Sequence, residues 1–172
     1  MQDTIARRSD VLKSSVEMKV PAGSTGKYQP GTITFRAAEG QSIDLEKIHQ
    51  SLKTTRLGGG TRSEVTFLEI TATGEVMANG KEAQLKVAGT EQTFALAAAP
   101  VAAGEEGKRT PFELLQEAVT QGKKVKSVTG RVDGWKGVWP QVLKEVPGET
   151  LQEPGKPPTK RMKLLVTAFE AG

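Results

Sequence analysis

The sequence predicts an α+β protein in which β-strands predominate. Short segments of alternating apolar and polar residues recur along its 172 residues, and nineteen glycines and nine prolines lie mostly between them. Two segments, 44–57 and 111–121, instead have the three- and four-residue apolar spacing of an amphipathic helix. A chain of this length can bury one sizeable core or two smaller ones.

Residues 1–30 are expected to form a basic arm followed by a turn-rich linker. Val16, Met18 and Val20 alternate with charged residues, as in a short edge strand, and the glycines and proline of 21–26 break any regular element. Such an arm either adds a strand to a sheet of its own chain or docks on a partner.

A strand, a helix and a second strand are predicted at 31–37, 44–57 and 64–73. This order resembles the first βαβ unit of a ferredoxin-like domain of the heavy-metal-associated family. In that family the loop after the first strand carries a Cys-x-x-Cys metal site, whereas 38–42 here reads Ala-Glu-Gly-Gln-Ser. The resemblance therefore implies a topology for residues 31–73 and argues against metal transfer.

The segment 64–76 is expected to be a strand that both halves of the chain share. Its alternation slips once, at Phe67-Leu68, which predicts a bulge or a strand that changes partners. Upstream it can close the βαβ unit, and downstream it can open a second domain.

Residues 70–172 are expected to form that second domain. Its predicted elements are strands 70–78, 83–88 and 93–97, helix 111–121, and strands 124–132 and 162–169. Thr110, Pro111 and Glu113 have the spacing of a helix cap. Three strands, a helix and two strands resemble the order of an OB-fold, which implies a five-stranded barrel. The long loop 134–160 joins positions from which OB-folds commonly bind ligands.

Several chemistries have no support in the residues. The absence of cysteine excludes disulfides, thiolate nucleophiles and zinc–thiolate or iron–sulfur sites. His49, the single histidine, lies on the apolar face of the predicted helix 44–57, where a packing role is more frequent than a catalytic or metal-binding one. The glycines of 58–60 follow a helix and lack the Gly-Lys-Ser/Thr ending of a phosphate loop. We therefore expect no catalytic residue, no metal site and no cofactor.

The net charge of +4 is unevenly distributed. Residues 1–36 hold six Lys/Arg against three Asp/Glu, residues 37–107 hold six against ten, and residues 108–172 hold twelve against seven. Basic ends can contact phosphates or acidic partners, although solvated surfaces are the more frequent meaning. The candidate partner-binding residues are Arg7, Arg8, Lys126, Arg131, Trp135, Lys136, Trp139 and Arg161.

Trp135 and Trp139 admit three roles. They can stack on the bases of single-stranded nucleic acid, anchor the loop 134–160 onto the barrel, or anchor another protein. We expect a non-catalytic binding module, an accessory or scaffold subunit that docks on a larger protein assembly. The alternatives are a single-stranded nucleic-acid-binding OB-fold protein and a degenerate heavy-metal-associated domain.

Localisation stays open at this point. No window approaches the roughly 18 consecutive apolar residues of a spanning helix, so no direct membrane insertion is expected. The first residues carry no apolar segment of a signal peptide, which fits either a cytoplasmic protein or an exported one whose signal peptide has been removed.

Overall fold

The computed structural model describes residues 2–22, 31–54, 64–79, 82–101, 104, 107–135, 137–138 and 145–172. The chain divides into two compact units: unit 1 comprises residues 1–66 and 136–146, and unit 2 comprises residues 67–135 and 147–172. The predicted α+β class, with strands in the majority, is confirmed. Among the described helices, none is long and apolar enough to cross a membrane.

The described residues of unit 1 form three helical segments and four short strands. They are α1 (Gln2–Ala6), η1 (Lys13–Ser15), β1 (Glu17–Lys19), β2 (Thr32–Thr34), α2 (Leu45–Thr54), β3 (Glu64–Val65) and β9 (Gly137–Val138). β1 pairs with β2 and β3 pairs with β9, both antiparallel. The pairing of β1 with a strand of its own chain is the first of the two arrangements expected of the arm.

The strands predicted for a βαβ unit do not share a sheet. β2 lies in one two-stranded sheet, β3 in another, and β4 (Glu69–Ala72) in the sheet of unit 2. The reason is that the predicted strand 64–73 is interrupted at residues 66–68 and pairs with β9 before the break and with β8 after it. The change of partner predicted from the slip at Phe67-Leu68 is thus confirmed.

The apolar face of α2 forms the core of unit 1. Leu45, Ile48 and Leu52 are buried, as is Ile5 of α1, which packs against α2. His49 lies on the same face and is only 1% exposed, so the histidine belongs to this core.

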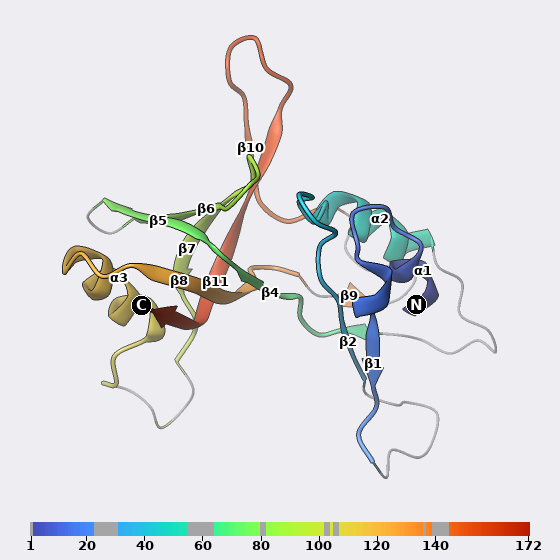
Figure 1. The fold of residues 1–172 in the computed structure, drawn as a ribbon, viewed down its shortest axis with the longest axis horizontal. Coiled ribbons are helices and arrows are strands. Elements are labelled where there is room, and N and C mark those ends of the chain that lie inside the picture. Colours follow the sequence, from blue (N-terminus) through green and yellow to red (C-terminus); the bar gives the residue numbers. More distant parts are fainter. Residues whose placement is uncertain are drawn as a thin grey trace. The chain divides into compact units, whose positions relative to one another are not determined.

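In the part of unit 2 that the structure describes, the chain forms one seven-stranded sheet and one helix (Figure 1). Besides β4 it contains β5 (Gly74–Asn79), β6 (Glu82–Val87), β7 (Thr93–Ala98), α3 (Pro111–Thr120), β8 (Val125–Val132), β10 (Glu149–Leu151) and β11 (Thr159–Ala171). The order across the sheet is β4-β8-β11-β7-β6-β5, and β10 pairs with β11. β7 and β11 run parallel, and the other pairs are antiparallel.

The sheet is open in the sense that its two end strands do not pair with each other, where the sequence predicted a five-stranded OB-like barrel. Its hydrogen-bonded path ends at β4 on one side and at β5 on the other. These two strands are successive parts of one segment separated only by Thr73, so they cannot pair side by side, and each pairs with a different neighbour. The two edges of the sheet are therefore covalently continuous.

Alternating side chains of the sheet and one face of α3 form the core of unit 2. The most buried are Leu85, Phe94, Leu115, Val128, Leu164 and Val166. The predicted cap holds α3 at its first turn: the Glu113 N–H donates to Thr110 Oγ1 (3.2 Å), and the Thr110 N–H donates to Glu113 Oε2 (2.7 Å).

Gly74 allows β5 to begin directly after β4. A Cβ atom at this position would lie 2.0 Å from the carbonyl oxygen of Lys86 on the paired strand β6. Any side chain at position 74 therefore has to displace the backbone of β6.

We expect Gly74→Ala to lower the free energy of unfolding by about 2 kcal/mol, because the added carbon overlaps backbone and not a movable side chain. Urea denaturation followed by circular dichroism measures the change. Thr73→Ala at the exposed neighbouring position is the control and should change stability by about 0.5 kcal/mol or less. Equal stability of the two variants would contradict the conclusion that only glycine fits at position 74, between β4 and β5.

Candidate functional site

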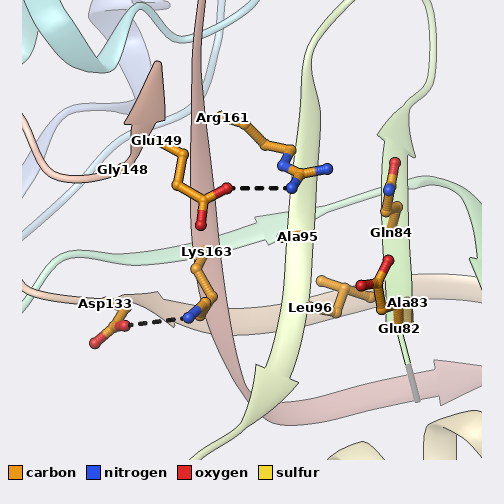
Figure 2. Close-up of a pocket in the computed structure, with 10 residues that line it drawn as sticks. All are labelled: Glu82, Ala83, Gln84, Ala95, Leu96, Asp133, Gly148, Glu149, Arg161 and Lys163. Carbon is orange, nitrogen blue, oxygen red and sulfur yellow. Dashed lines mark hydrogen bonds and ion pairs between the residues drawn. The ribbon is translucent and has the colours of Figure 1, made fainter. Parts of the chain in front are cut away.

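A groove on the outer face of the unit 2 sheet contains one of the predicted partner-binding residues, Arg161. Its volume is about 300 Å³, and its lining includes Gln84 of β6, Ala95 of β7, Arg161 and Lys163 of β11, Glu149 of β10 and Asp133 (Figure 2). We call it the charged groove. Arg161 and Lys163 alternate with the buried Met162 and Leu164, so strand geometry directs them away from the core.

Two ion pairs form the charged walls of this groove. Arg161 Nη2 lies 3.3 Å from Glu149 Oε2, its direct partner in the β10–β11 register, and Lys163 Nζ lies 4.0 Å from Asp133 Oδ2 (Figure 2). The register also places Gln84, Ala95 and Lys163 side by side on three neighbouring strands. The short side chain of Ala95 leaves the space between the charged walls.

Arg131 of β8 lies on the same sheet, beside Leu165 of β11 and Glu69 of β4 in the register. Its guanidinium carbon lies 4.3 Å from the centre of the Phe67 ring, and its Nε donates to Glu69 Oε2 at 3.3 Å. We call Phe67, Glu69 and Arg131 the Arg131 stack. The Arg131 side chain is 52% exposed, and Phe67 is 40% exposed.

Phe67 was not among the predicted site residues. The alternation of Val65 and Phe67 makes both look like core positions, but the chain changes sheets between them. The slip at Phe67-Leu68 was the signal that this side chain need not face the core.

Trp135 and Lys126 do not join the same surface. Trp135 is only 2% exposed, so its ring cannot stack on a base, whereas anchoring of the loop agrees with its burial. Lys126 is five residues from Arg131 on β8, about 16 Å away at roughly 3.3 Å per residue. Lys136 and Trp139 lie outside the described residues.

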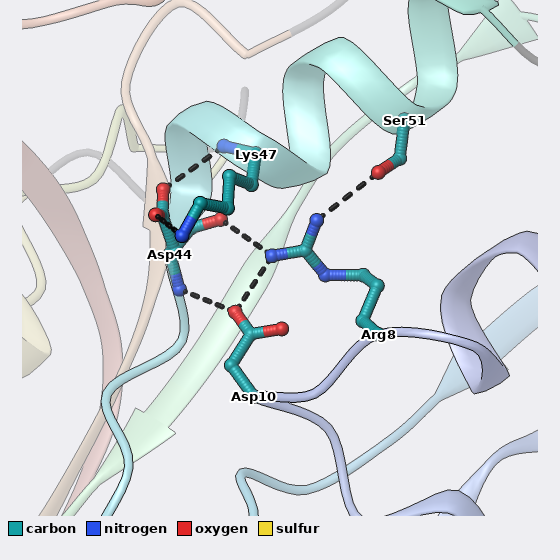
Figure 3. Close-up of polar contacts among 5 residues, drawn as sticks. All are labelled: Arg8, Asp10, Asp44, Lys47 and Ser51. Carbon is teal, nitrogen blue, oxygen red and sulfur yellow. Dashed lines mark hydrogen bonds and ion pairs between the residues drawn. The ribbon is translucent and has the colours of Figure 1, made fainter.

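Arg8 belongs to the interior of unit 1 (Figure 3). Its Nη2 lies 2.6 Å from Asp10 Oδ2 and also donates to the Asp44 carbonyl at 3.2 Å, while Nη1 donates to Ser51 Oγ at 3.0 Å. The Arg8 side chain is 7% exposed, so it joins the N-terminal segment to α2 and offers no docking surface. Arg7, its neighbour, is exposed.

We expect Arg8→Ala to lower the free energy of unfolding by about 3 kcal/mol, because the substitution leaves the mostly buried Asp10 carboxylate without its cation. Hydrogen exchange of the α2 amides, together with urea denaturation, measures the loss. Arg7→Ala is the matched control and should have little effect; similar losses in both variants would mean that the internal contacts of Arg8 are not what stabilises this unit.

Asp44 stands at the start of α2 and carries a perturbed carboxyl group. Burial acts to raise its pKa, but the Lys47 N–H (2.9 Å to Oδ1), the Lys47 ammonium (3.1 Å to Oδ2) and the charge of Arg8 outweigh burial and lower it. The folded state therefore stabilises the ionised form of the Asp44 carboxyl group relative to the protonated form.

A lowered folded-state pKa gives stability that is present above the unfolded-state pKa, near 4, and is lost as pH falls through the folded-state value. We expect Asp44→Asn to be less stable than wild type at pH 7 and to lose less stability on acidification from about pH 5 to pH 2. Urea midpoints measured across this range test the expectation. Parallel pH curves for the two proteins would refute it.

The described residues contain no group of three or more His, Asp or Glu side chains placed to hold a metal ion. Comparisons with protein-family models, with curated proteins and with solved structures found no match to this chain. The function has to be inferred from the geometry of the charged groove and the Arg131 stack.

Proposed function

We propose that this protein is a non-catalytic binding module, an accessory or scaffold subunit that docks on a larger protein assembly through the outer face of the unit 2 sheet. The Arg131 stack carries the proposal. Arginine and aromatic side chains dominate the binding energy of protein interfaces, and here one of each is partly exposed on the same surface.

The stack is also held in place before any partner arrives. Glu69 accepts the Nε–H of Arg131 on one side, and the Phe67 ring supports the guanidinium from another. A long side chain that is already ordered loses less conformational freedom on association than a free one. This arrangement favours binding through Arg131.

The charged groove favours a partner that carries charges of both signs. Its lining offers three carboxylates and two cations, and four of these groups form the pairs Arg161–Glu149 and Lys163–Asp133. Charges at the rim of an interface contribute orientation and selectivity more than affinity. We assign the anchoring to the Arg131 stack and the choice of partner to the charged groove.

The strand order of unit 2 adds support by analogy. It resembles the OB-fold, in which the face of the second and third strands and the neighbouring loops bind ligands. The corresponding strands here are β6 and β7, and residues of both line the charged groove. This support rests on element order and not on a motif.

Single-stranded nucleic acid fits this face less well. The charged groove and the Arg131 stack together hold the cations Arg131, Arg161 and Lys163 and the acids Glu69, Glu82, Asp133 and Glu149. Three cations against four carboxylates give a charge of −1, which does not attract phosphates. Trp135, one of the two tryptophans predicted to stack on bases, is buried.

Capture of partners from the source organism, with identification by cross-linking mass spectrometry, tests the proposal. We expect Phe67→Ala and Arg131→Ala each to reduce capture of the same partner about tenfold, as loss of an interface anchor does.

Two controls match these variants outside the outer face. Leu114 is 40% exposed on α3, and Arg109 pairs with Glu117 of the same helix. Leu114→Ala and Arg109→Ala should capture the partner as wild type does. Equal capture by all four variants would reject the Arg131 stack as the anchor, and salt-sensitive recovery of nucleic acid without protein would favour the alternative function.

A further inference from the structure

A second groove, about 870 Å³ in volume, lies in unit 2 where α3 ends and β8 begins. Four aliphatic side chains line it: Val76, Val87, Val119 and Val125. Four lysines also line it: Lys86, Lys123, Lys124 and Lys126. We call this surface the lysine groove; it shares no lining residue with the charged groove.

The backbone at the end of α3 determines where Lys123 and Lys124 lie. The Lys123 N–H donates to the Ala118 carbonyl and the Gly122 N–H to the Val119 carbonyl, both at 2.9 Å, with Gly122 at φ +73°. This helix-ending motif turns the chain so that Lys123 and Lys124 follow directly after α3.

Lys126 owes its position to an irregularity in β8. Ser127 pairs with Glu170 and Val125 pairs with Ala171, so Lys126 is an extra residue between two successive pairs. A β-bulge of this kind re-aims the side chain that it inserts, and the Lys126 side chain is 59% exposed.

The positive charge of the lysine groove is only partly balanced. Lys123 and Lys124 form no ion pair with any residue that the structure describes. Lys86 lies 4.0 Å from Glu91 and Lys126 lies 3.8 Å from Glu170, so these two lysines are paired. Four lysines against Glu75, Glu91 and Glu170 leave a charge of +1. The carbonyl end of α3 offsets only about half a charge.

The aliphatic lining of the groove favours a peptide ligand over nucleic acid. Val76, Val87 and Val119 are partly exposed and present apolar surface beside the lysines, whereas Val125 is buried. None of the residues that line the groove is aromatic, which leaves no platform for stacked bases. Branched aliphatic side chains instead match leucine, isoleucine or valine of a peptide.

We propose that the lysine groove binds an acidic segment of a partner protein in which aspartate or glutamate residues flank aliphatic ones. The carboxylates contact Lys123, Lys124 and Lys126, and the aliphatic side chains cover the valines. The site is separate from the Arg131 stack, so this proposal and the docking function can succeed or fail independently.

Fluorescence anisotropy with the full chain tests the proposal. The probe is a labelled peptide of about twelve residues in which glutamates surround leucines. We expect Lys123→Glu combined with Lys124→Glu to weaken its binding at least tenfold. Lys13→Glu combined with Lys156→Glu reverses two exposed lysines elsewhere and should weaken binding no more than about twofold, because distant surface charges are screened.

Three outcomes would count against the proposal. Equal losses in the two double variants would overturn the proposal, since attraction would then follow net charge alone. Equal binding of an all-glutamate peptide without leucine would also overturn it, because the valines would play no part. Tighter lysine-dependent binding of oligothymidylate would overturn it in favour of nucleic acid. Phe67→Ala should leave peptide binding unchanged, and its circular dichroism, like that of the double variants, should match wild type.

Discussion

Strand β11 is the constraint on which unit 2 depends. β5, β6 and β7 form one antiparallel series and β4 and β8 form another, and among the described strands only β11 is hydrogen-bonded to both, through β7 and β8. The same strand serves the interior and the surface, since Met162, Leu164 and Val166 enter the core while Arg161 and Lys163 form the walls of the charged groove. A change that weakens β11 therefore alters the core and the groove together.

The features that the sequence predicted correctly are local ones. The alternation around Leu85 and the cap formed by Thr110 and Glu113 are encoded within a few residues, so the strand β6 and the helix α3 occur where they were expected. The pairing of strands depends on residues far apart in the chain, and this is where prediction failed. β2 and β3 took different partners, and β9 and β10 are strands of two and three residues that exist because of their partners and not because of their own pattern.

Site prediction had the same limit. Residue type indicated Arg131 and Arg161 as surface cations, and strand geometry placed both on the outer face. Whether Arg8 or Trp135 is exposed depends on what surrounds it, which no local pattern reports, and both proved to be buried. Phe67 was missed for the complementary reason: its apolar character suggested the core, but its position after the change of sheet leaves it partly exposed beside Arg131.

The two grooves of unit 2 differ in how they use charge. On the outer face each cation has a carboxylate within 4.0 Å, so the long-range field is small and the charges act only at contact. In the lysine groove Lys123 and Lys124 have no such partner among the described residues, so their field extends over about one Debye length, roughly 10 Å at 0.1 M salt. Association at the lysine groove should therefore slow as salt is added, while selectivity at the charged groove should persist. One sheet thus supports one surface suited to attracting an acidic segment and another suited to discriminating between partners at contact.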